Sequence, residues 1–291
     1  MSQKEKFIGG DALDSLIRTA LREDIGTGDI TTLSVIPADA RAYGRYIAKE
    51  DGVLCGMDIA ERVYALLGEE MGETDVHFTR HFEDGQPFHK GDVLAEVEGN
   101  AITLLSGERV GLNLMQHLSG IATLTHRAVS AVSGTNAKIV DTRKTTPGMR
   151  VIEKYAVRVG GGTNHRFNLA DGILIKDNHI VAAGGITEAV RAARLRAPHT
   201  LKIEVEVENE AQLLEALEAG ADIIMLDNMT EEEMAHAVAL TNRRALLEAS
   251  GNMGERDLSK VAKTGVDLIS IGALTHSARA MDISLKFSLK R

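Results

Sequence analysis

Basic side chains gather in one part of an otherwise acidic chain. Residues 141–180 carry seven lysines and arginines against four acids, although the whole protein has a formal net charge of -9. A concentration of positive charge attracts anions, so we expect this segment to bind an anionic ligand. The seven cations are Arg143, Lys144, Arg150, Lys154, Arg158, Arg166 and Lys176.

Two acids, Glu206 and Asp227, each lie near the end of an apolar run. Carboxylates on neighbouring strand ends can hold Mg²⁺, accept hydrogen bonds from sugar hydroxyls, or stabilise an oxocarbenium ion. For Asp227 the structural alternative is to cap the following helix. Glu204, Glu206 and Glu208 alternate with apolar residues, so on a strand all three point to one face. Of these we select Glu206, because it is near the strand end.

The basic groups differ in what they can bind. Arginine offers a planar fork that suits a carboxylate, whereas lysine supplies a point charge that suits phosphate, so Arg143 and Lys144 could serve two ligands. The glycine run at 160–162 lets backbone N–H groups approach an anion, and His165 and Arg166 follow it. A plain surface loop and a flexible linker are the structural alternatives for these two segments.

Other polar residues have competing interpretations. Lys176 follows three apolar residues and could form a Schiff base, as in an aldolase. His179 has no second histidine at ligand spacing, so a hydrogen-bonded structural role is favoured over metal binding. Cys55 lies in GVLCGM and is expected to be a buried apolar residue. Two short loops are candidates for a phosphate site: Ser250-Gly251-Asn252 and Ser270-Ile271-Gly272.

Six apolar runs in the second half of the chain alternate with helical segments. Because the runs are apolar throughout, they fit strands of a parallel sheet buried on both faces. A β/α barrel with eight strands or fewer fits better than an open doubly wound sheet, since no GxGxxG follows the first run. Chemistry in such barrels lies at the carboxyl ends of the strands. The runs are AKIVDT, GILIKDN, LKIEVEV, DIIMLDN, ALLEAS and DLISIG, and the residues at their ends are Arg143, Lys144, Lys176, Glu206, Asp227, Ser250 and Gly272.

The first part of the chain predicts a separate α+β domain. Residues 11–23 show helical periodicity, the Gly-rich segment 24–32 suggests a loop, and a strand, helix, strand and hairpin follow. A long helix is expected from Ser106, with that serine as its N-cap and a break near Ser119 and Gly120. We therefore expect two domains, residues 1–115 and residues 116–275, with a tail of about 276–291 that could pack back on the first.

Composition limits the kinds of protein this can be. A chain of 291 residues with 44% hydrophobic residues can form a large core. It has no run of eighteen apolar residues and no secretory signal, so we expect a cytoplasmic protein without a membrane partner. A single cysteine excludes an internal disulfide. Net acidity and 3% aromatic residues argue against nucleic acid and favour small-molecule partners.

With these residues identified, the chain closely resembles the bacterial quinolinate phosphoribosyltransferases, which are decarboxylating enzymes of NAD biosynthesis. Eight blocks in order carry the resemblance over nearly the whole chain. They are EDIGTGDIT at 23–31, ERVGLNLMQHLSGIAT at 108–123, DTRKTTPGMR at 141–150, KYAVRVGGGTNHRFNLADGILIKDNH at 154–179, EVEVEN at 204–209, IMLDN at 224–228, EASGN at 248–252 and GVDLISIGALTHS at 265–277.

The resemblance implies a fold, a reaction and a set of site residues. The fold would be an N-terminal α+β sandwich domain followed by an incomplete parallel β/α barrel, in at least a homodimer. Quinolinate and phosphoribosyl pyrophosphate would give nicotinate mononucleotide, pyrophosphate and CO₂, with Mg²⁺ as cofactor. The quinolinate pocket would be lined by Thr142, Arg143, His165, Arg166 and Lys176, with Arg109 reaching across from the partner subunit. Lys144 would meet the pyrophosphate, Glu206 and Asp227 would hold the ribose and Mg²⁺, and Ser250, Gly251, Asn252 and Gly272 would cradle the 5-phosphate.

Two other functions stay open from the residues alone. A Schiff-base aldolase would use Lys176 as its nucleophile and would be trapped by borohydride with a carbonyl substrate. A non-catalytic binding protein would take up phosphoribosyl pyrophosphate but release no pyrophosphate.

Overall fold

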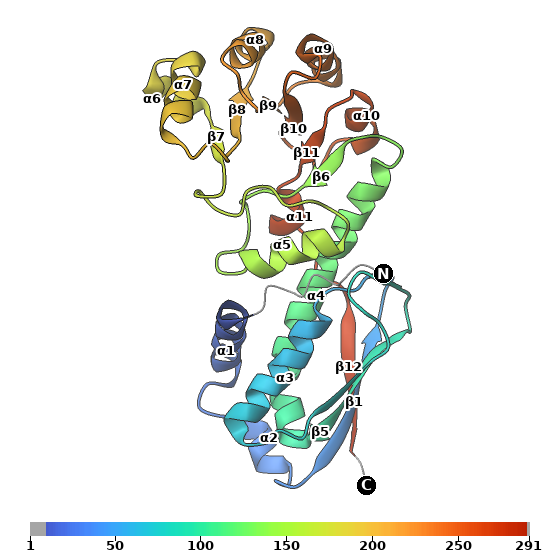
Figure 1. Cartoon of the computed structure of the whole chain (residues 1–291). Helices are drawn as coiled ribbons and strands as arrows, with labels where there is room; N and C mark the ends of the chain where they lie inside the picture. Colours follow the sequence, from blue (N-terminus) through green and yellow to red (C-terminus); the bar gives the residue numbers. More distant parts are fainter. Residues whose placement is uncertain (1–9, 290–291) are drawn as a thin grey trace. The chain divides into compact units, whose positions relative to one another are not determined.

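The computed structural model describes residues 10–289, which form two compact α/β units (Figure 1). Within the described residues, the first unit contains 10–124, 146–160 and 278–289, and the second, called here the barrel unit, contains 125–145 and 161–277. Residues 1–9, which are most of the segment 1–14 that lacks the apolar stretch of a secretory signal, lie outside the described part, as do residues 290 and 291. The α/β class expected from the sequence is confirmed.

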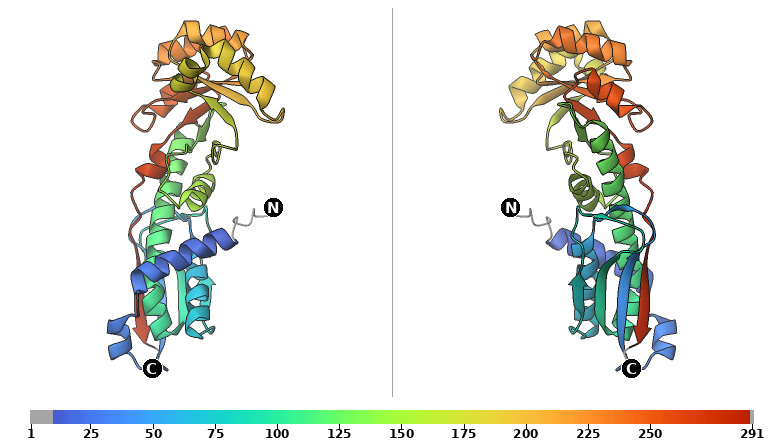
Figure 2. Two further views of the ribbon diagram at one scale, coloured as in Figure 1. Left: turned by 90° about the vertical axis from the view of Figure 1, so that its left-hand side faces the viewer. Right: turned by 90° about the vertical axis from the view of Figure 1, so that its right-hand side faces the viewer.

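An antiparallel sheet with the strand order β12-β1-β5-β3 forms the centre of the first unit. β1 (Arg41–Ala48) and β12 (Ile283–Leu289) pair along their length although they come from opposite ends of the chain (Figure 2). The tail expected at about 276–291 thus supplies an edge strand to this sheet. The other strands are β5 (Val93–Asn100), β3 (His77–Arg80) and the small pair β2 (Gly52–Val53) and β4 (Pro87–Phe88).

Helices cover this sheet and bury a shared core. α1 (Asp11–Ile25) buries Leu13, Ile17 and Leu21, which follow one another at helical spacing, as the sequence predicts. α3 (Met57–Met71) packs its apolar face into the core, where the Tyr46 and Tyr64 hydroxyls lie 2.9 Å apart. The segment 24–32 is not entirely a loop, because α2 (Ile30–Val35) begins in it. The carboxylate of Asp29 caps that helix by accepting from the Thr32 N–H at 3.0 Å.

The long helix α4 (Ala101–Ala131) differs from its prediction at both of the points the sequence singled out. It begins five residues before Ser106, because the Asn100 side chain accepts from the Ile102 N–H at 2.9 Å and serves as the cap. It also continues through Ser119 and Gly120. The Ser119 hydroxyl accepts from the Cys55 N–H at 3.0 Å and donates to the Cys55 carbonyl at 3.1 Å. Burial raises the pKa of the Cys55 thiol, in agreement with the apolar role predicted for it.

Gly120 allows the backbone that precedes β12 to lie against α4. A Cβ at this position would lie 2.1 Å from the carbonyl oxygen of Arg279. We expect Gly120→Ala to destabilise the protein by about 1–3 kcal/mol, because backbone on both sides has to shift. Chemical denaturation will measure this, with Gly111→Ala in the same helix as control, where the added Cβ would meet only the Tyr46 hydroxyl at 3.2 Å. Equal stabilities of the two variants would contradict the prediction.

The barrel unit is a six-stranded parallel sheet with the order β6-β11-β10-β9-β8-β7. All six apolar runs of the sequence are strands, so that prediction is confirmed. Among the described residues β6 and β7 remain edge strands, and the barrel is therefore incomplete, as expected. The strands are β6 (Lys138–Val140), β7 (Ile173–Ile175), β8 (Ile203–Val207), β9 (Ile223–Asp227), β10 (Leu246–Ser250) and β11 (Leu268–Ser270).

Helices connect successive strands and lie on the outer face of this sheet (Figure 1). Their positions leave the carboxyl ends of the strands and the loops that follow them to form the candidate site. The helices are α6 (Asp177–Ala183), α7 (Ile186–Arg196), α8 (Glu210–Glu218), α9 (Glu231–Thr241) and α10 (Leu258–Lys263), whereas α11 (Ala273–His276) follows β11, the last strand of this sheet along the chain.

The two units divide the chain differently from the expected break at residue 115. The break falls inside α4 after Leu124, and α5 (Arg150–Val159) groups with the first unit. The reason lies in contacts of α5: buried Glu153 lies 2.9 Å from His117 Nε2, and the Tyr155 hydroxyl donates to Asp84 at 2.8 Å. The basic segment 141–180 is thereby split, with three of its cations, Arg150, Lys154 and Arg158, on α5.

Candidate active site

Twelve of the thirteen predicted site residues lie in the barrel unit: ten at the ends of its strands or in the loops that follow them, and two, His165 and Arg166, in the segment between α5 and β7. Each of the six strands contributes at least one of them. The exception is Arg109, which lies on α4 in the first unit. Its part in the site stays a prediction that depends on a second subunit.

The loop after β6 is held by hydrogen bonds that leave its basic side chains at the surface. The Thr142 hydroxyl accepts from the Lys144 N–H at 3.0 Å, and the Lys144 carbonyl accepts from the Thr275 hydroxyl at 2.7 Å. A Cβ on Gly272 would lie 3.0 Å from the Lys144 side chain. The structure therefore brings Lys144 together with Gly272, two residues predicted to contact the phosphates.

Asp141, directly after β6, holds the segment that carries His165 and Arg166. Its buried carboxylate accepts from the His165 N–H at 2.8 Å and from the Asn164 side chain at 2.7 Å. The Arg166 guanidinium donates to the Gly172 carbonyl at 2.9 Å. These contacts fix the loop that carries His165 and Arg166, so the glycine run before it is not a free linker.

Glu204 and Glu206 of β8, and Glu208 directly after it, become more exposed toward the strand end. Glu204 is buried, Glu206 is partly exposed and Glu208 is exposed. Glu206 forms an ion pair with Lys176, which follows β7. An ammonium group paired with a carboxylate is suited to binding an anion, whereas a lysine that forms a Schiff base has to react as the neutral amine. This pairing therefore favours anion binding over the aldolase alternative.

Backbone conformations are unusual at the ends of β9 and β10. Asn228, Gly251 and Asn252 all have positive φ, at 55°, 96° and 49°. Asp227 accepts from the Asn228 side chain at 2.8 Å and is aligned with Ser250 in the sheet register. Left-handed residues outside glycine are uncommon and collect at functional sites. These turns set Asp227 beside the loop predicted to hold a phosphate.

His179 does not belong to this group of strand-end residues. It lies on α6, and its Nδ1 accepts from the Lys176 N–H at 3.0 Å. This is the hydrogen-bonded structural role that the sequence favoured.

Arginine charges in the site repel one another. Partial burial lowers the pKa of Arg166, and the nearby guanidinium of Arg143 lowers it further, while Glu204 opposes both effects. An anionic ligand beside Arg166 would be favoured, because it would replace the water that the guanidinium loses on burial and would offset the repulsion from Arg143.

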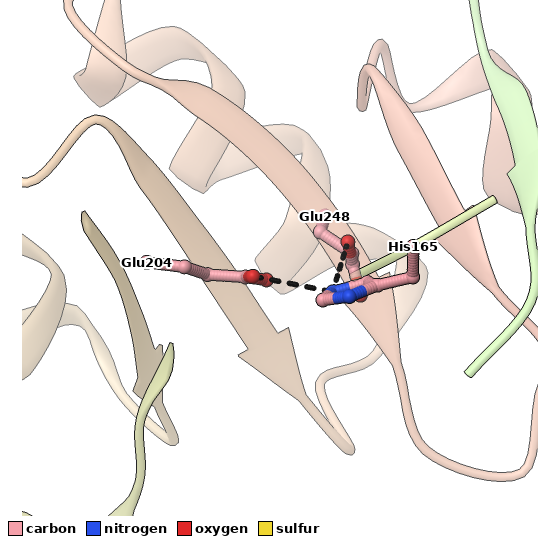
Figure 3. A group of neighbouring side chains, drawn as sticks. All are labelled: His165, Glu204 and Glu248. Atoms are coloured by element: carbon pink, nitrogen blue, oxygen red, sulfur yellow. Dashed lines mark ion pairs between the residues drawn. The ribbon is translucent and has the colours of Figure 1, made fainter. Parts of the chain in front are cut away.

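Two acids that the strand-end criterion does not select, Glu204 and Glu248, are buried in the barrel unit. Their carboxylates approach His165 inside the barrel (Figure 3). The signal was present, because each is an acid inside an otherwise apolar strand, two residues before a selected residue. Selection by proximity to the strand end passed over both of them.

An incomplete β/α barrel with arginines, lysines and two carboxylates at its strand ends is typical of enzymes that act on anionic substrates. Comparison with known proteins identifies the family. Residues 29–119 match the family Quinolinate phosphoribosyl transferase, N-terminal domain, and residues 121–286 match Quinolinate phosphoribosyl transferase, C-terminal domain. The chain belongs to the quinolinate phosphoribosyl transferase family.

Individual relatives agree over almost the full length. The Probable nicotinate-nucleotide pyrophosphorylase [carboxylating] of Bacillus subtilis (strain 168) is 48% identical, covering 95% of this chain and 94% of the relative. The mitochondrial Quinolinate phosphoribosyltransferase [decarboxylating] 2a of Nicotiana tabacum is 41% identical over 94% of this chain and 82% of its own. The crystal structure of NadC from Streptococcus pyogenes superposes with a TM-score of 0.89 at 43% identity, covering 96% and 97% of the two chains.

No helix within residues 10–289 has both the length and the apolar character needed to span a membrane.

Proposed function

We infer that this protein is a decarboxylating quinolinate phosphoribosyltransferase. It transfers the phosphoribosyl group of phosphoribosyl pyrophosphate to quinolinate and yields nicotinate mononucleotide, pyrophosphate and CO₂ for NAD biosynthesis. The two bracketed terms in the relatives' names describe this one reaction in opposite directions. The observation that carries the inference is family membership over both domains, residues 29–119 and 121–286.

The basic residues at the strand ends supply the proposed quinolinate pocket. Quinolinate is a dianion. Burying a charge without a partner costs roughly several kcal/mol, so each of its two carboxylates needs a cationic partner. We assign this role to Arg143, Arg166 and Lys176, with Thr142 and His165 completing the lining. Desolvation and repulsion already act on Arg166, which supports its assignment.

The other half of the proposed site receives phosphoribosyl pyrophosphate. Lys144 would contact the pyrophosphate, and the turn of Ser250, Gly251 and Asn252, together with Gly272, would hold the 5-phosphate. The closeness of Gly272 to the Lys144 side chain and the left-handed turn at residues 251 and 252 support this assignment.

Glu206 and Asp227 fit the cofactor that the family implies. Both offer carboxylate oxygens at neighbouring strand ends, and oxygen ligands are those that Mg²⁺ prefers. When bound, Mg²⁺ would supply a positive charge that stabilises the pyrophosphate leaving group. To bind Mg²⁺, the Glu206 carboxylate would have to give up part of its contact with the Lys176 ammonium.

The residues of the site would promote a displacement at C1 of the ribose. The pyridine nitrogen of quinolinate forms a bond to C1 as the bond from C1 to the pyrophosphate oxygen breaks. Positive charge develops on the sugar, and the carboxylates of Glu206 and Asp227 stabilise it. The ring nitrogen is then cationic and stabilises the electron pair that stays on ring carbon C2 when the 2-carboxylate leaves as CO₂. A proton from solvent adds to C2 and completes the product.

One assay tests this function directly. Purified protein with quinolinate, phosphoribosyl pyrophosphate and Mg²⁺ should release CO₂ and pyrophosphate in equal amounts, with nicotinate measured beside quinolinate as the alternative acceptor. Binding of phosphoribosyl pyrophosphate without pyrophosphate release would instead identify a binding protein. Borohydride inactivation with a carbonyl substrate would identify an aldolase.

We further propose that the protein is a cytoplasmic homodimer in which Arg109 completes the partner's site. If so, Arg109→Ala and Lys144→Ala should each be inactive alone and recover activity when mixed and allowed to exchange subunits. A hybrid dimer then holds one intact site, so recovery should approach about a quarter of the wild-type activity.

A double variant of Arg109 and Lys144 provides the control for this experiment. Mixed with either single variant it can form no intact site, so those mixtures should stay inactive. Absence of recovery in the main mixture, with subunit exchange demonstrated by mass spectrometry, would argue against a shared site.

A further inference from the structure

The imidazole of His165 lies between two carboxylates inside the barrel (Figure 3). Its Nε2 is 3.2 Å from Glu204 Oε2 and 3.6 Å from Glu248 Oε2. The side chains of His165, Glu204 and Glu248 are 14%, 6% and 1% exposed. We call these three residues the His165 cluster. A barrel interior is normally filled by apolar side chains, so two acids at this depth require an explanation.

The hydrogen bonds of His165 fix where its proton lies. Nδ1 accepts from the backbone N–H of Arg166 at 2.7 Å, so Nδ1 carries no proton. The neutral ring therefore has its proton on Nε2, which points toward the two carboxylates. His165 thus contacts the backbone of Arg166, which we assign to quinolinate binding, through Nδ1, and faces Glu204 and Glu248 through Nε2.

The carboxylates of the cluster are not fully satisfied. Among the described residues, Glu204 Oε1 and Glu248 Oε1 are buried without a hydrogen-bond partner. Burial and the charge of Glu204 raise the pKa of Glu248 to about 7, against the opposing effects of His165, Ser270 and Lys176. From the neighbouring strand β9, the residue in register with Glu248 is Met225, which does not titrate.

We propose that Glu248 is a positioning residue that, in its neutral form, holds the His165 imidazole together with Glu204 and thereby keeps Arg166 in place for quinolinate. The inference rests on the proposed function. In its ionised form Glu248 adds a negative charge to a cluster that lies near Arg166 and Lys176, and that charge competes with the dianionic substrate for the same cations.

A metal ion is the alternative occupant of the His165 cluster. The three side chains are close enough to ligate one, since their ligand atoms lie within 4.8 Å of one another. A metal on Nε2, however, would require the ring proton on Nδ1, where the Arg166 N–H already donates. The hydrogen bond to Nδ1 therefore favours a proton over a metal ion in the cluster.

The proposal predicts a pH dependence for quinolinate binding. Because the neutral form of Glu248 is the competent one, the KM for quinolinate should rise roughly tenfold between pH 7 and pH 8.5 as that form is lost. Both carboxylates of quinolinate stay ionised over this range, so the substrate does not cause the change. The KM for phosphoribosyl pyrophosphate should change much less.

The experiment compares wild type with Glu248→Gln and Glu248→Leu. Glutamine keeps the shape and a polar oxygen near Nε2 but does not ionise, so the KM for quinolinate should stay within about twofold from pH 7 to 8.5. Leucine removes that polar oxygen, so the KM should be raised throughout. Glu208→Gln, at an exposed acid that directly follows β8, is the control and should keep the wild-type profile. A Glu248→Gln variant with an unchanged pH profile would overturn the proposal.

Two measurements need no turnover. Histidine-selective ¹⁵N NMR, with the His165 signal assigned by its loss in His165→Gln, should show the Nε2–H tautomer in wild type, and the Nδ1–H tautomer would refute the proposal. Metal analysis of the purified protein should find no ion that depends on Glu248, and one ion per chain that is lost in Glu248→Gln would also refute it. If wild type does not convert quinolinate, the proposed function fails, whereas these two measurements still test the cluster.

Discussion

Replacing Glu206 or Asp227 with alanine should lower kcat by about a hundredfold to a thousandfold while the KM for quinolinate changes less than about threefold. The reason is the place of these two carboxylates at the ends of β8 and β9. There they would face a sugar that becomes positively charged only as the bond to pyrophosphate breaks. An interaction made mainly in the transition state affects kcat and leaves substrate binding nearly unchanged.

The two variants are not equivalent, and the difference is informative. Glu206 also pairs with Lys176, so Glu206→Ala releases a cation that we assign to quinolinate, and a modest fall in the KM for quinolinate can accompany the loss of kcat. Asp227 has no such ion pair among the described residues and gives the cleaner test. Steady-state kinetics will measure both, with Glu208→Ala, at the exposed residue after β8, as the control. A raised KM for quinolinate with an unchanged kcat would remove the assignment.

Arg166→Ala should raise the KM for quinolinate by about tenfold to a hundredfold, with a smaller effect on kcat. Loss of one hydrogen-bonded ion pair to a charged ligand is worth about 1.5–3 kcal/mol, which corresponds to this range. Arg166→Lys should fall between wild type and alanine, because lysine keeps the charge but loses the planar fork and its contact with the Gly172 carbonyl.

Isothermal titration of quinolinate, together with kinetics, will separate binding from turnover in these variants. Arg196→Ala, at an exposed position at the end of α7, is the control for a general loss of positive charge. If Arg166→Ala bound quinolinate as wild type does and lost only kcat, Arg166 would act in the transition state and its assignment to the ground-state pocket would be wrong.

Local sequence patterns predicted the barrel well because its strands are apolar throughout. A strand buried on both faces needs a continuous apolar run, and such runs can be read without knowing their neighbours. The same runs located the strand ends, so Lys176, Glu206, Asp227 and Ser250 could be selected before the fold was known. The parallel order then gathers these residues at one edge of the sheet.

Boundaries that depend on distant contacts were predicted less well. Ser106 had the residue type of an N-cap, but Asn100 caps α4 because the chain leaves β5 at that residue. Ser119 and Gly120 read as a helix break. Instead, Ser119 forms a hydrogen bond with the Cys55 backbone, and Gly120 allows the Arg279 backbone to approach the helix. Both partners are far away in the sequence. Secondary-structure propensity contains no information about such partners.

By itself, the sequence determined the six strands, the residues at their ends and the family. Only the tertiary structure decided that the basic segment divides between two units and that Glu204 and Glu248 meet at His165 across β9. The physical reason is that a strand's apolar pattern is a property of neighbouring residues, whereas the environment of a buried charge depends on residues that only folding brings together.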